Sequence, residues 1–143
     1  QPADKREALP GMPRIYQLLR DRSNVNRPLS FISGSPTFFA RVLQNKMKLD
    51  GVLYDEIVLK PFKDLLVHGG LNPIGLLKEQ VGYKLEALLR LRQNIPPQSK
   101  EVLMGDDTEA DPIVYALYTK LVQRKMNEEE LYKELKKLKV SRF

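Results

Sequence analysis

Two kinds of segment alternate along this chain, and their order restricts the possible folds more than any other feature. Short apolar stretches are expected to form strands; they lie at 28–33, within 51–59 and at 100–105. Apolar residues recur at helical spacing around them, and the expected helices lie at 14–22, 37–46, 74–93, from 111 onward and after Asn127. Strands that alternate with helices predict an α/β domain with a largely parallel sheet, whose sites lie at the carboxyl ends of the strands.

The spacing of apolar residues in these helices predicts which side chains form the core. They are Phe38, Phe39, Val42 and Leu43 in the second helix, and Leu77, Val81, Leu85, Leu88 and Leu89 in the third. Asp111-Pro112 is expected to open the next helix, because proline suits the first helical turn. Asn127 and Glu130 predict a variant of the capping box for the final helix, which also carries a favourable pair of charges at Glu129 and Lys133.

The length and composition limit the domain count and the chemistry. A chain of 143 residues supports one core, so we expect a single domain. It has no cysteine and one histidine, which excludes disulfide frameworks, thiolate zinc sites and cysteine nucleophiles and makes a histidine-rich metal site improbable. No apolar run is long enough to span a membrane, so a soluble, cytoplasmic protein is expected.

The charge is unevenly spread along the chain. The formal net charge of +6 favours anionic partners such as phosphate esters, acidic lipid surfaces or nucleic acid. Part of the basic excess lies at 133–142, where it could simply solvate one helix. We assign residues 1–13 to a linker or N-terminal extension, 14–126 to the domain and 127–143 to a C-terminal amphipathic helix. That helix could pack on its own domain or dock on an anionic membrane, which would make the protein membrane-associated.

The first predicted strand runs directly into Ser33-Gly34-Ser35-Pro36. A small hydroxyl residue followed by glycine exposes side-chain and backbone donors that suit a phosphate oxygen. The same pattern suits a tight turn that leads into a helix N-cap. The residues alone leave both interpretations open.

Four acidic residues follow the predicted strand at 100–105, namely Asp106, Asp107, Glu109 and Asp111. Crowded carboxylates repel each other unless solvent or a cation screens them, and hard oxygen ligands suit Mg²⁺. The alternative is an acidic first turn favoured by the helix dipole, which explains Glu109 and Asp111 better than Asp106. A magnesium site and an ordinary helix start therefore both stay open.

Lys84 lies three residues after Val81 and four before Leu88, on the apolar face of its predicted helix. A lysine in that position must either extend its stem to water or meet an anion. A hydroxyl turn, a lysine on an apolar face and a strand-end acidic cluster are together the parts needed to hold and neutralise a phosphoryl group.

These segments resemble a known group of enzymes. Phe31 to Pro36, Tyr83-Lys84-Leu85 with Leu88, and Val102 to Asp106 with Asp111-Pro112 and Tyr115 are similar to the second, third and fourth motifs of the haloacid dehalogenase superfamily. More narrowly, and with Pro10-Gly11-Met12 before a helix, they resemble the phosphatidate phosphatase catalytic domain of the actin-patch type over about residues 9–118. The resemblance implies a haloacid-dehalogenase-like, Rossmannoid three-layer α/β fold with a mostly parallel sheet.

The resemblance also implies a role for each matching residue. Ser33 would hydrogen-bond the phosphoryl oxygens, with Gly34 and Ser35 beside it in the substrate site. Lys84 would neutralise the phosphate and an aspartyl intermediate. Asp106 would bind Mg²⁺ with help from Asp111, and Asp107 could act through a water molecule.

One part of the superfamily pattern is absent from these residues. The superfamily attacks phosphorus with the first aspartate of an Asp-x-Asp motif on the central strand, and no Asp-x-Asp occurs in this sequence. We therefore expect a domain that is incomplete at its N-terminus. The full-length protein is expected to hydrolyse a phosphomonoester, with phosphatidate or another lipid phosphate as the leading substrate. The chain as given is expected to bind Mg²⁺ and phosphate without turnover, because the covalent route needs the nucleophile.

Two other classes of function remain open. A non-catalytic module could use the same pocket or the basic tail to bind phosphate or anionic lipid. A helical interaction protein with accidental motifs is a weaker third interpretation. Nucleic acid is not an expected partner, because Phe31, Phe38, Phe39 and Tyr115 lie at core spacings rather than among exposed basic residues.

Overall fold

The computed structural model describes residues 10–21, 27–61, 73–107 and 110–138. Contacts between residues divide the chain into two compact units, Gln1–Val67 and His68–Phe143, and each unit is considered by itself. The division falls inside the stretch 14–126 that the sequence assigned to one domain, and that assignment stays a prediction. The expected irregular segment at 62–73 and most of the expected linker at 1–13 lie outside the described residues.

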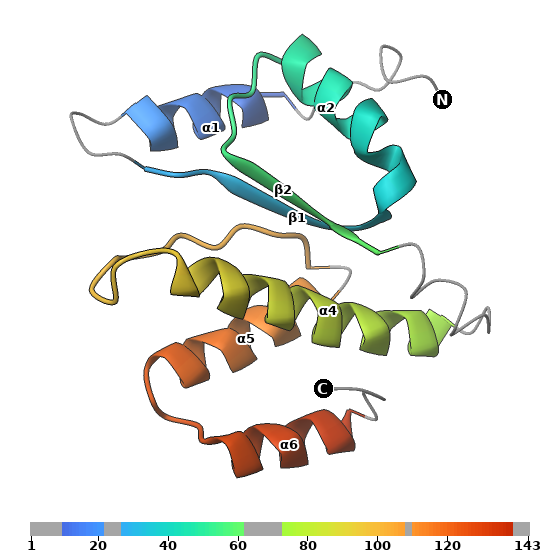
Figure 1. Ribbon diagram of the computed structural model, residues 1–143, viewed down its shortest axis with the longest axis vertical. Helices are drawn as coiled ribbons and strands as arrows, with labels where there is room; N and C mark the ends of the chain where they lie inside the picture. Colours follow the sequence, from blue (N-terminus) through green and yellow to red (C-terminus); the bar gives the residue numbers. More distant parts are fainter. Residues whose placement is uncertain (1–9, 22–26, 62–72, 108–109, 139–143) are drawn as a thin grey trace. The chain divides into compact units, whose positions relative to one another are not determined.

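The first unit is a small α/β arrangement built around two parallel strands. Its elements are α1 (Met12–Asp21), β1 (Ser30–Pro36), the 3₁₀ turn η2 (Thr37–Phe39), α2 (Ala40–Leu49) and β2 (Glu56–Lys60). β1 pairs with β2 in parallel, in a register that places Phe31 opposite Ile57. Figure 1 shows α1 and α2 on the same side of the two strands. The α/β class and the parallel pairing expected from the sequence are therefore confirmed for this pair.

Aromatic rings join α1 to the strand layer. The Tyr16 ring meets the Phe31 ring edge-on, with centroids 5.3 Å apart, and Phe31 meets Tyr54 in the same manner at 6.2 Å. The Asp55 carboxylate accepts hydrogen bonds from both terminal nitrogens of the Arg20 guanidinium and from the backbone N–H of Leu29. These contacts connect the end of α1, the approach to β1 and the approach to β2.

The helix expected at 37–46 is present, but its predicted core face is wrong at three positions. Phe38, Phe39 and Val42 are 59%, 42% and 37% exposed. Leu43, the fourth expected core residue, is only half-buried. A two-stranded sheet covers one side of a short helix at most, and helical spacing alone does not tell how wide that cover is.

α2 ends in a turn that requires a left-handed backbone. The N–H of Gly51 bonds to the carbonyl of Lys48, and the N–H of Val52 bonds to the carbonyl of Met47. Gly51 has a φ of 67°, which glycine adopts without steric cost. The helix therefore stops in a Schellman motif with the residue type that favours it.

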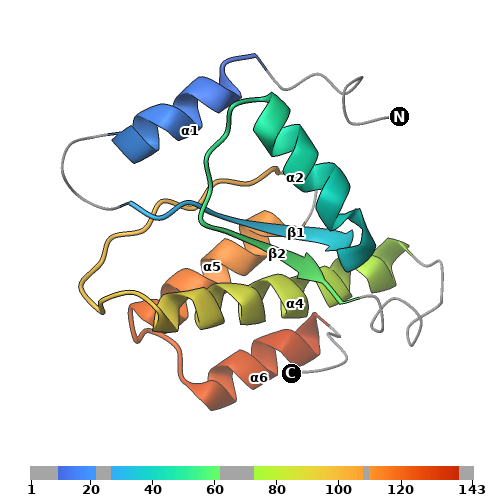
Figure 2. The ribbon, with the colours of Figure 1, turned by 45° about the horizontal axis from the view of Figure 1, so that its top comes forward.

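The second unit contains three helices in its described part. They are α4 (Pro73–Gln93), α5 (Asp111–Val122) and α6 (Glu128–Lys137). Figure 2 shows α4 alongside α5 and the short connection from α5 into α6. Their shared core consists of the buried side chains Val81, Leu85, Ala87, Leu88, Ala110, Val114, Leu117, Tyr118, Leu131 and Leu135. The helical stripe read from Val81, Leu85 and Leu88 is therefore confirmed.

Different capping motifs define the start of α6 and the end of α5. Asn127 accepts a hydrogen bond from the Glu130 N–H while the Glu130 carboxylate accepts one from the Asn127 N–H, so the predicted capping box is present. The predicted Glu129–Lys133 ion pair is also present, at 2.7 Å. α5 ends in a Schellman motif like that of α2, but the left-handed residue is Arg124, with a φ of 56°.

The strand expected at 100–105 is wrong, because that segment is irregular in the structure. A strand needs a neighbour for its backbone hydrogen bonds, and within the described ranges the sheet contains β1 and β2 only. Side chains from the neighbouring helices hold the segment instead, and Val102 and Met104 are 72% and 44% exposed. The apolar residues of this segment suggested a strand, but the local sequence does not show whether a neighbouring strand is present.

Candidate functional site

The hydroxyl turn of the first unit lies in an irregularity at the end of β1. Ser33 is paired with Leu59 and Pro36 with Lys60, so Gly34 and Ser35 bulge between these two pairs. The Ser33 hydroxyl accepts a hydrogen bond from the Ser35 N–H at 3.2 Å. Bulges occur often beside active sites because they redirect side chains. The tight turn expected at 33–36 is therefore wrong, because β1 continues to Pro36 and contains a bulge there, which we call the hydroxyl turn.

The predicted lysine of the second unit forms a buried ion pair. Lys84 Nζ donates to Asp111 Oδ1 at 2.6 Å, and both residues are less than one-tenth exposed. α4 supplies the lysine from its apolar face, and the first residue of α5 supplies the carboxylate. Of the two possibilities left open by the sequence, an extended stem or an anionic partner, the structure has the anionic partner.

Asp111 lies so close to the backbone at position 105 that this position has room only for glycine. A Cβ atom placed on Gly105 would lie 2.7 Å from Cβ of Asp111 and closer still to its Oδ2 oxygen. Glycine at this position therefore allows the Asp111 carboxylate to rest against the backbone just before Asp106.

Tyr115 connects the acidic segment to α5. Its hydroxyl donates to the carbonyl of Met104 at 2.7 Å. Burial, and after it the negative charges of Asp111 and Asp106, together raise the pKa of Tyr115 to about 12. Asp106 and Asp111 thus both act electrostatically on the Tyr115 phenol.

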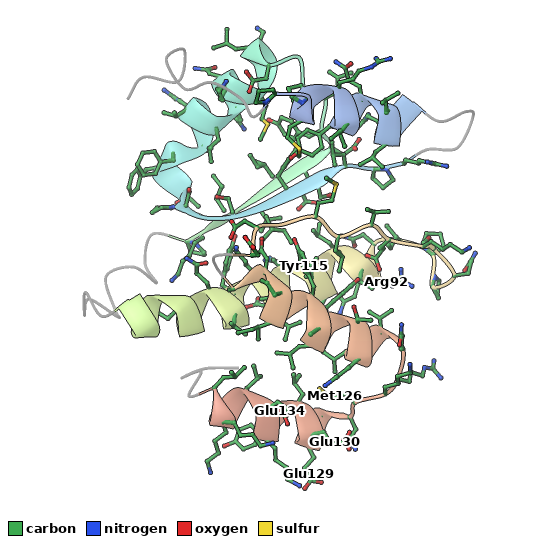
Figure 3. The ribbon with its side chains drawn as sticks, turned by 180° about the vertical axis from the view of Figure 1, so that it is seen from behind. Arg92, Tyr115, Met126, Glu129, Glu130 and Glu134 are labelled. Atoms are coloured by element: carbon green, nitrogen blue, oxygen red, sulfur yellow. The ribbon has the colours of Figure 1, made fainter. Side chains whose placement is uncertain are left out.

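A second cluster fixes the other end of this segment. The Arg92 guanidinium donates to a Glu101 carboxylate oxygen and to the carbonyl of Ser99, each at 3.0 Å, and to the carbonyl of Pro97. The Tyr118 hydroxyl lies 2.8 Å from both oxygens of Glu101. Burial and the Glu101 hydrogen bond raise the pKa of Tyr118. Figure 3 shows Arg92 and Tyr115 along the segment that leads from α4 to α5.

The residues present suit magnesium in a limited way. Mg²⁺ is commonly held by one or two carboxylates with water and phosphate oxygens completing its shell, and Asp106 and Asp111 are the two carboxylates predicted for this role. Among the residues that the structure describes, no three His, Cys, Asp or Glu side chains gather closely enough to hold a metal ion. The third predicted ligand, Asp107, is exposed, and the metal assignment stays a prediction.

The structure brings some of the predicted site residues together. Lys84 and Asp111 are in contact, and Asp106 acts on the same tyrosine, Tyr115, as Asp111 does. Ser33, Gly34 and Ser35 form their own turn in the other unit, so their convergence with Lys84 stays a prediction.

Sequence reasoning missed two further contributors to this site. They are the close contact at Gly105 and the Tyr115 hydroxyl bond. The available signals were a glycine directly before the acidic cluster and a tyrosine one helical turn after Asp111.

The catalytic-domain family of phosphatidate phosphatase APP1 matches residues 1–137. The chain belongs to this family. Membership supports phosphatase activity in general and confirms the narrower of the two resemblances seen in the motifs. No solved structure matches the chain. None of the described helices combines the length and apolar character that a membrane crossing requires.

Proposed function

We propose that this chain belongs to a Mg²⁺-dependent phosphatase domain of the haloacid dehalogenase type. Its substrate would be a phosphomonoester, with phosphatidate or another lipid phosphate favoured by the family to which the chain belongs. The observation that carries the proposal is the buried Lys84–Asp111 pair beside the acidic segment. A cation held on an apolar helix face by one carboxylate is suited to neutralise a second anion such as a phosphoryl group.

Each matching residue would have a separate task. The Ser33 hydroxyl and the N–H groups of Gly34 and Ser35 would bind phosphoryl oxygens. Lys84 would offset their negative charge, and Asp111 would hold the lysine in place. Asp106 and Asp111 would hold Mg²⁺, with Asp107 acting through water, and the bound ion would supply charge stabilisation to the phosphoryl oxygens.

The nucleophile would be an aspartate that is not among these residues, because the sequence contains no Asp-x-Asp. We expect the 143 residues to bind phosphate and Mg²⁺ but not to release phosphate from a substrate. The missing motif is also the observation that favours the second candidate function, a non-catalytic module that binds phosphate or anionic lipid.

Calorimetric titration of the chain with inorganic phosphate in the presence of MgCl₂ tests the site assignment. Lys84→Met should weaken phosphate binding about tenfold or more, because a charge-assisted contact is lost, and Ser33→Ala about fivefold. Asp106→Asn should remove most of the Mg²⁺ binding. Glu128→Gln, which neutralises an exposed carboxylate on α6, is the matched control and should change neither titration. Binding that survives both Lys84→Met and Asp106→Asn would contradict the assignment.

Phosphate release separates the enzyme from the binding module. The longest expressed form of the protein that includes an upstream Asp-x-Asp should release phosphate from an aryl phosphate only with Mg²⁺, and from phosphatidate in mixed micelles. Asp106→Asn and Lys84→Ala should abolish both activities. Absence of any release, with phosphate binding intact, would favour the non-catalytic module.

A further inference from the structure

The 3₁₀ turn η2 and the helix α2 that follows it carry exposed apolar side chains. Val42 and Leu49 are seven residues apart and therefore share one face of α2, and Phe38 of η2 precedes Val42 by four residues. These three side chains are 59%, 37% and 65% exposed. The Phe38 and Phe39 rings lie against each other with centroids 4.5 Å apart. The helix thus has a second apolar side besides the half-buried one that contains Leu43.

Basic residues accompany this stripe. Arg41 and Lys48 are both exposed and also lie seven residues apart, so they form a line beside the apolar one. From Pro28 to Leu49 the sequence contains no aspartate or glutamate. The nearest carboxylate, Asp50, is paired with Lys46 at 2.5 Å. A short helix with an exposed apolar stripe, a basic flank and no acidic residue is typical of segments that lie in the surface of an anionic bilayer.

The position of the stripe fits a substrate that is itself a lipid. Phe38 follows Ser35 by three residues, so the apolar stripe begins where the proposed phosphate-binding turn ends. The phosphate of a bilayer lipid lies at the membrane surface with its acyl chains below, so a protein that reaches this phosphate must bring its neighbouring side chains to the same depth. In this respect the inference rests on the proposed function.

The basic C-terminal helix is a poorer candidate for the same task. Leu131 and Leu135 are 8% and 3% exposed, so its apolar side is already covered. Glutamates alternate with its lysines, and Figure 3 shows Glu129 on the side of α6 that faces away from α5. We propose that the Phe38–Val42–Leu49 stripe of η2 and α2, with Arg41 and Lys48, docks on the surface of an anionic phospholipid bilayer and presents the Ser33–Ser35 turn to it.

Sedimentation of the full chain with vesicles tests the proposal. Phosphatidylcholine vesicles with and without phosphatidylglycerol are the probes, because neither lipid carries a phosphomonoester and the phosphate pocket is not needed for binding. The chain should bind the anionic vesicles preferentially. Phe38→Ser should lower the partition coefficient about tenfold, and Arg41→Gln and Lys48→Gln about fivefold each. Added salt should weaken the wild-type interaction.

Matched controls keep the outcome independent of folding and of catalysis. Leu53→Ser removes an apolar side chain that is 72% exposed but lies outside α2, and Lys136→Gln removes an exposed lysine of α6. Both should bind like the wild type, and far-ultraviolet circular dichroism should be unchanged in every variant. Equal loss with Leu53→Ser and Phe38→Ser would overturn the proposal, as would dimerisation without vesicles that Phe38→Ser abolishes. Intact binding of inorganic phosphate without vesicle binding would reject the docking surface and leave the proposed function standing.

Discussion

Replacing Lys84 by methionine should be one of the most destabilising single changes available in the second unit. Methionine keeps most of the length of the lysine side chain but removes its ammonium group. That group donates a hydrogen bond of 2.6 Å to Asp111 Oδ1. The side chains of Lys84 and Asp111 are only 8% and 13% exposed, so water cannot replace the lost partner. Leaving one buried charge without its partner costs about 3–5 kcal/mol. We expect that loss in the free energy of unfolding, measured by urea denaturation at neutral pH.

A double-mutant cycle tests the cause of this loss. Asp111→Asn keeps the shape of the side chain and removes its charge. When it is combined with Lys84→Met, the unpaired buried carboxylate that destabilises the Lys84→Met protein is no longer present. The double variant should therefore be much less unstable than the sum of the two single changes, with a coupling energy of about 2 kcal/mol. Lys133→Met is the matched control, because its ion pair with Glu129 is of similar length, 2.7 Å, but its lysine is 63% exposed.

The control should have no measurable effect on unfolding, since exposed ion pairs contribute little. The reasoning fails if Lys84→Met and Lys133→Met lower stability equally. It also fails if the two changes at Lys84 and Asp111 simply add, because the pair would then not be an energetic unit.

Three smaller predictions concern single residues. The Tyr83 hydroxyl is buried and has no hydrogen-bond partner in the described part of the chain, so Tyr83→Phe should raise the free energy of unfolding by about 1 kcal/mol in urea; a loss of that size would mean that the hydroxyl is bonded. Arg124→Gly should stabilise α5 by about 1 kcal/mol because it relieves a left-handed backbone, whereas Gly51→Ala at the equivalent turn of α2 should destabilise by a similar amount; opposite signs in thermal melts are the check. Hydrogen bonds from Arg20 and from the Leu29 N–H lower the pKa of Asp55 below its ordinary value of 3.8. Its contribution to stability is therefore complete above that value and is lost as the pH falls through the lower folded value, so Asp55→Asn should flatten the acid limb of the stability–pH curve, and an unchanged limb would refute this.

The elements that local sequence could predict are those whose stabilising contacts are themselves local. α4, α5 and α6 follow from apolar spacing and from capping residues such as Asn127, whose partner lies three positions away. The segment at 100–105 has strand-like composition, but a strand exists only through a neighbour that composition does not reveal. The exposure of Phe38 has the same origin, because helical spacing identifies a side but not what covers it.

The candidate site could likewise be predicted only in part. The apolar position of Lys84 required either water or an anion, and only the fold, by bringing together residues 27 positions apart, selected Asp111. The bulge that displaces Gly34 and Ser35 depends on the register with β2, which the sequence does not contain. The sequence therefore indicated what kind of group each site residue would need to contact, but not which residue elsewhere in the fold would supply that contact.

The contact between Gly105 and Asp111 has a consequence for how this protein can change over time. The Asp111 side chain occupies the volume in which any larger residue at position 105 would begin, so position 105 depends on what stands at 111. A mutation that enlarges residue 105 requires a smaller or displaced residue at 111, and such a replacement would release Lys84.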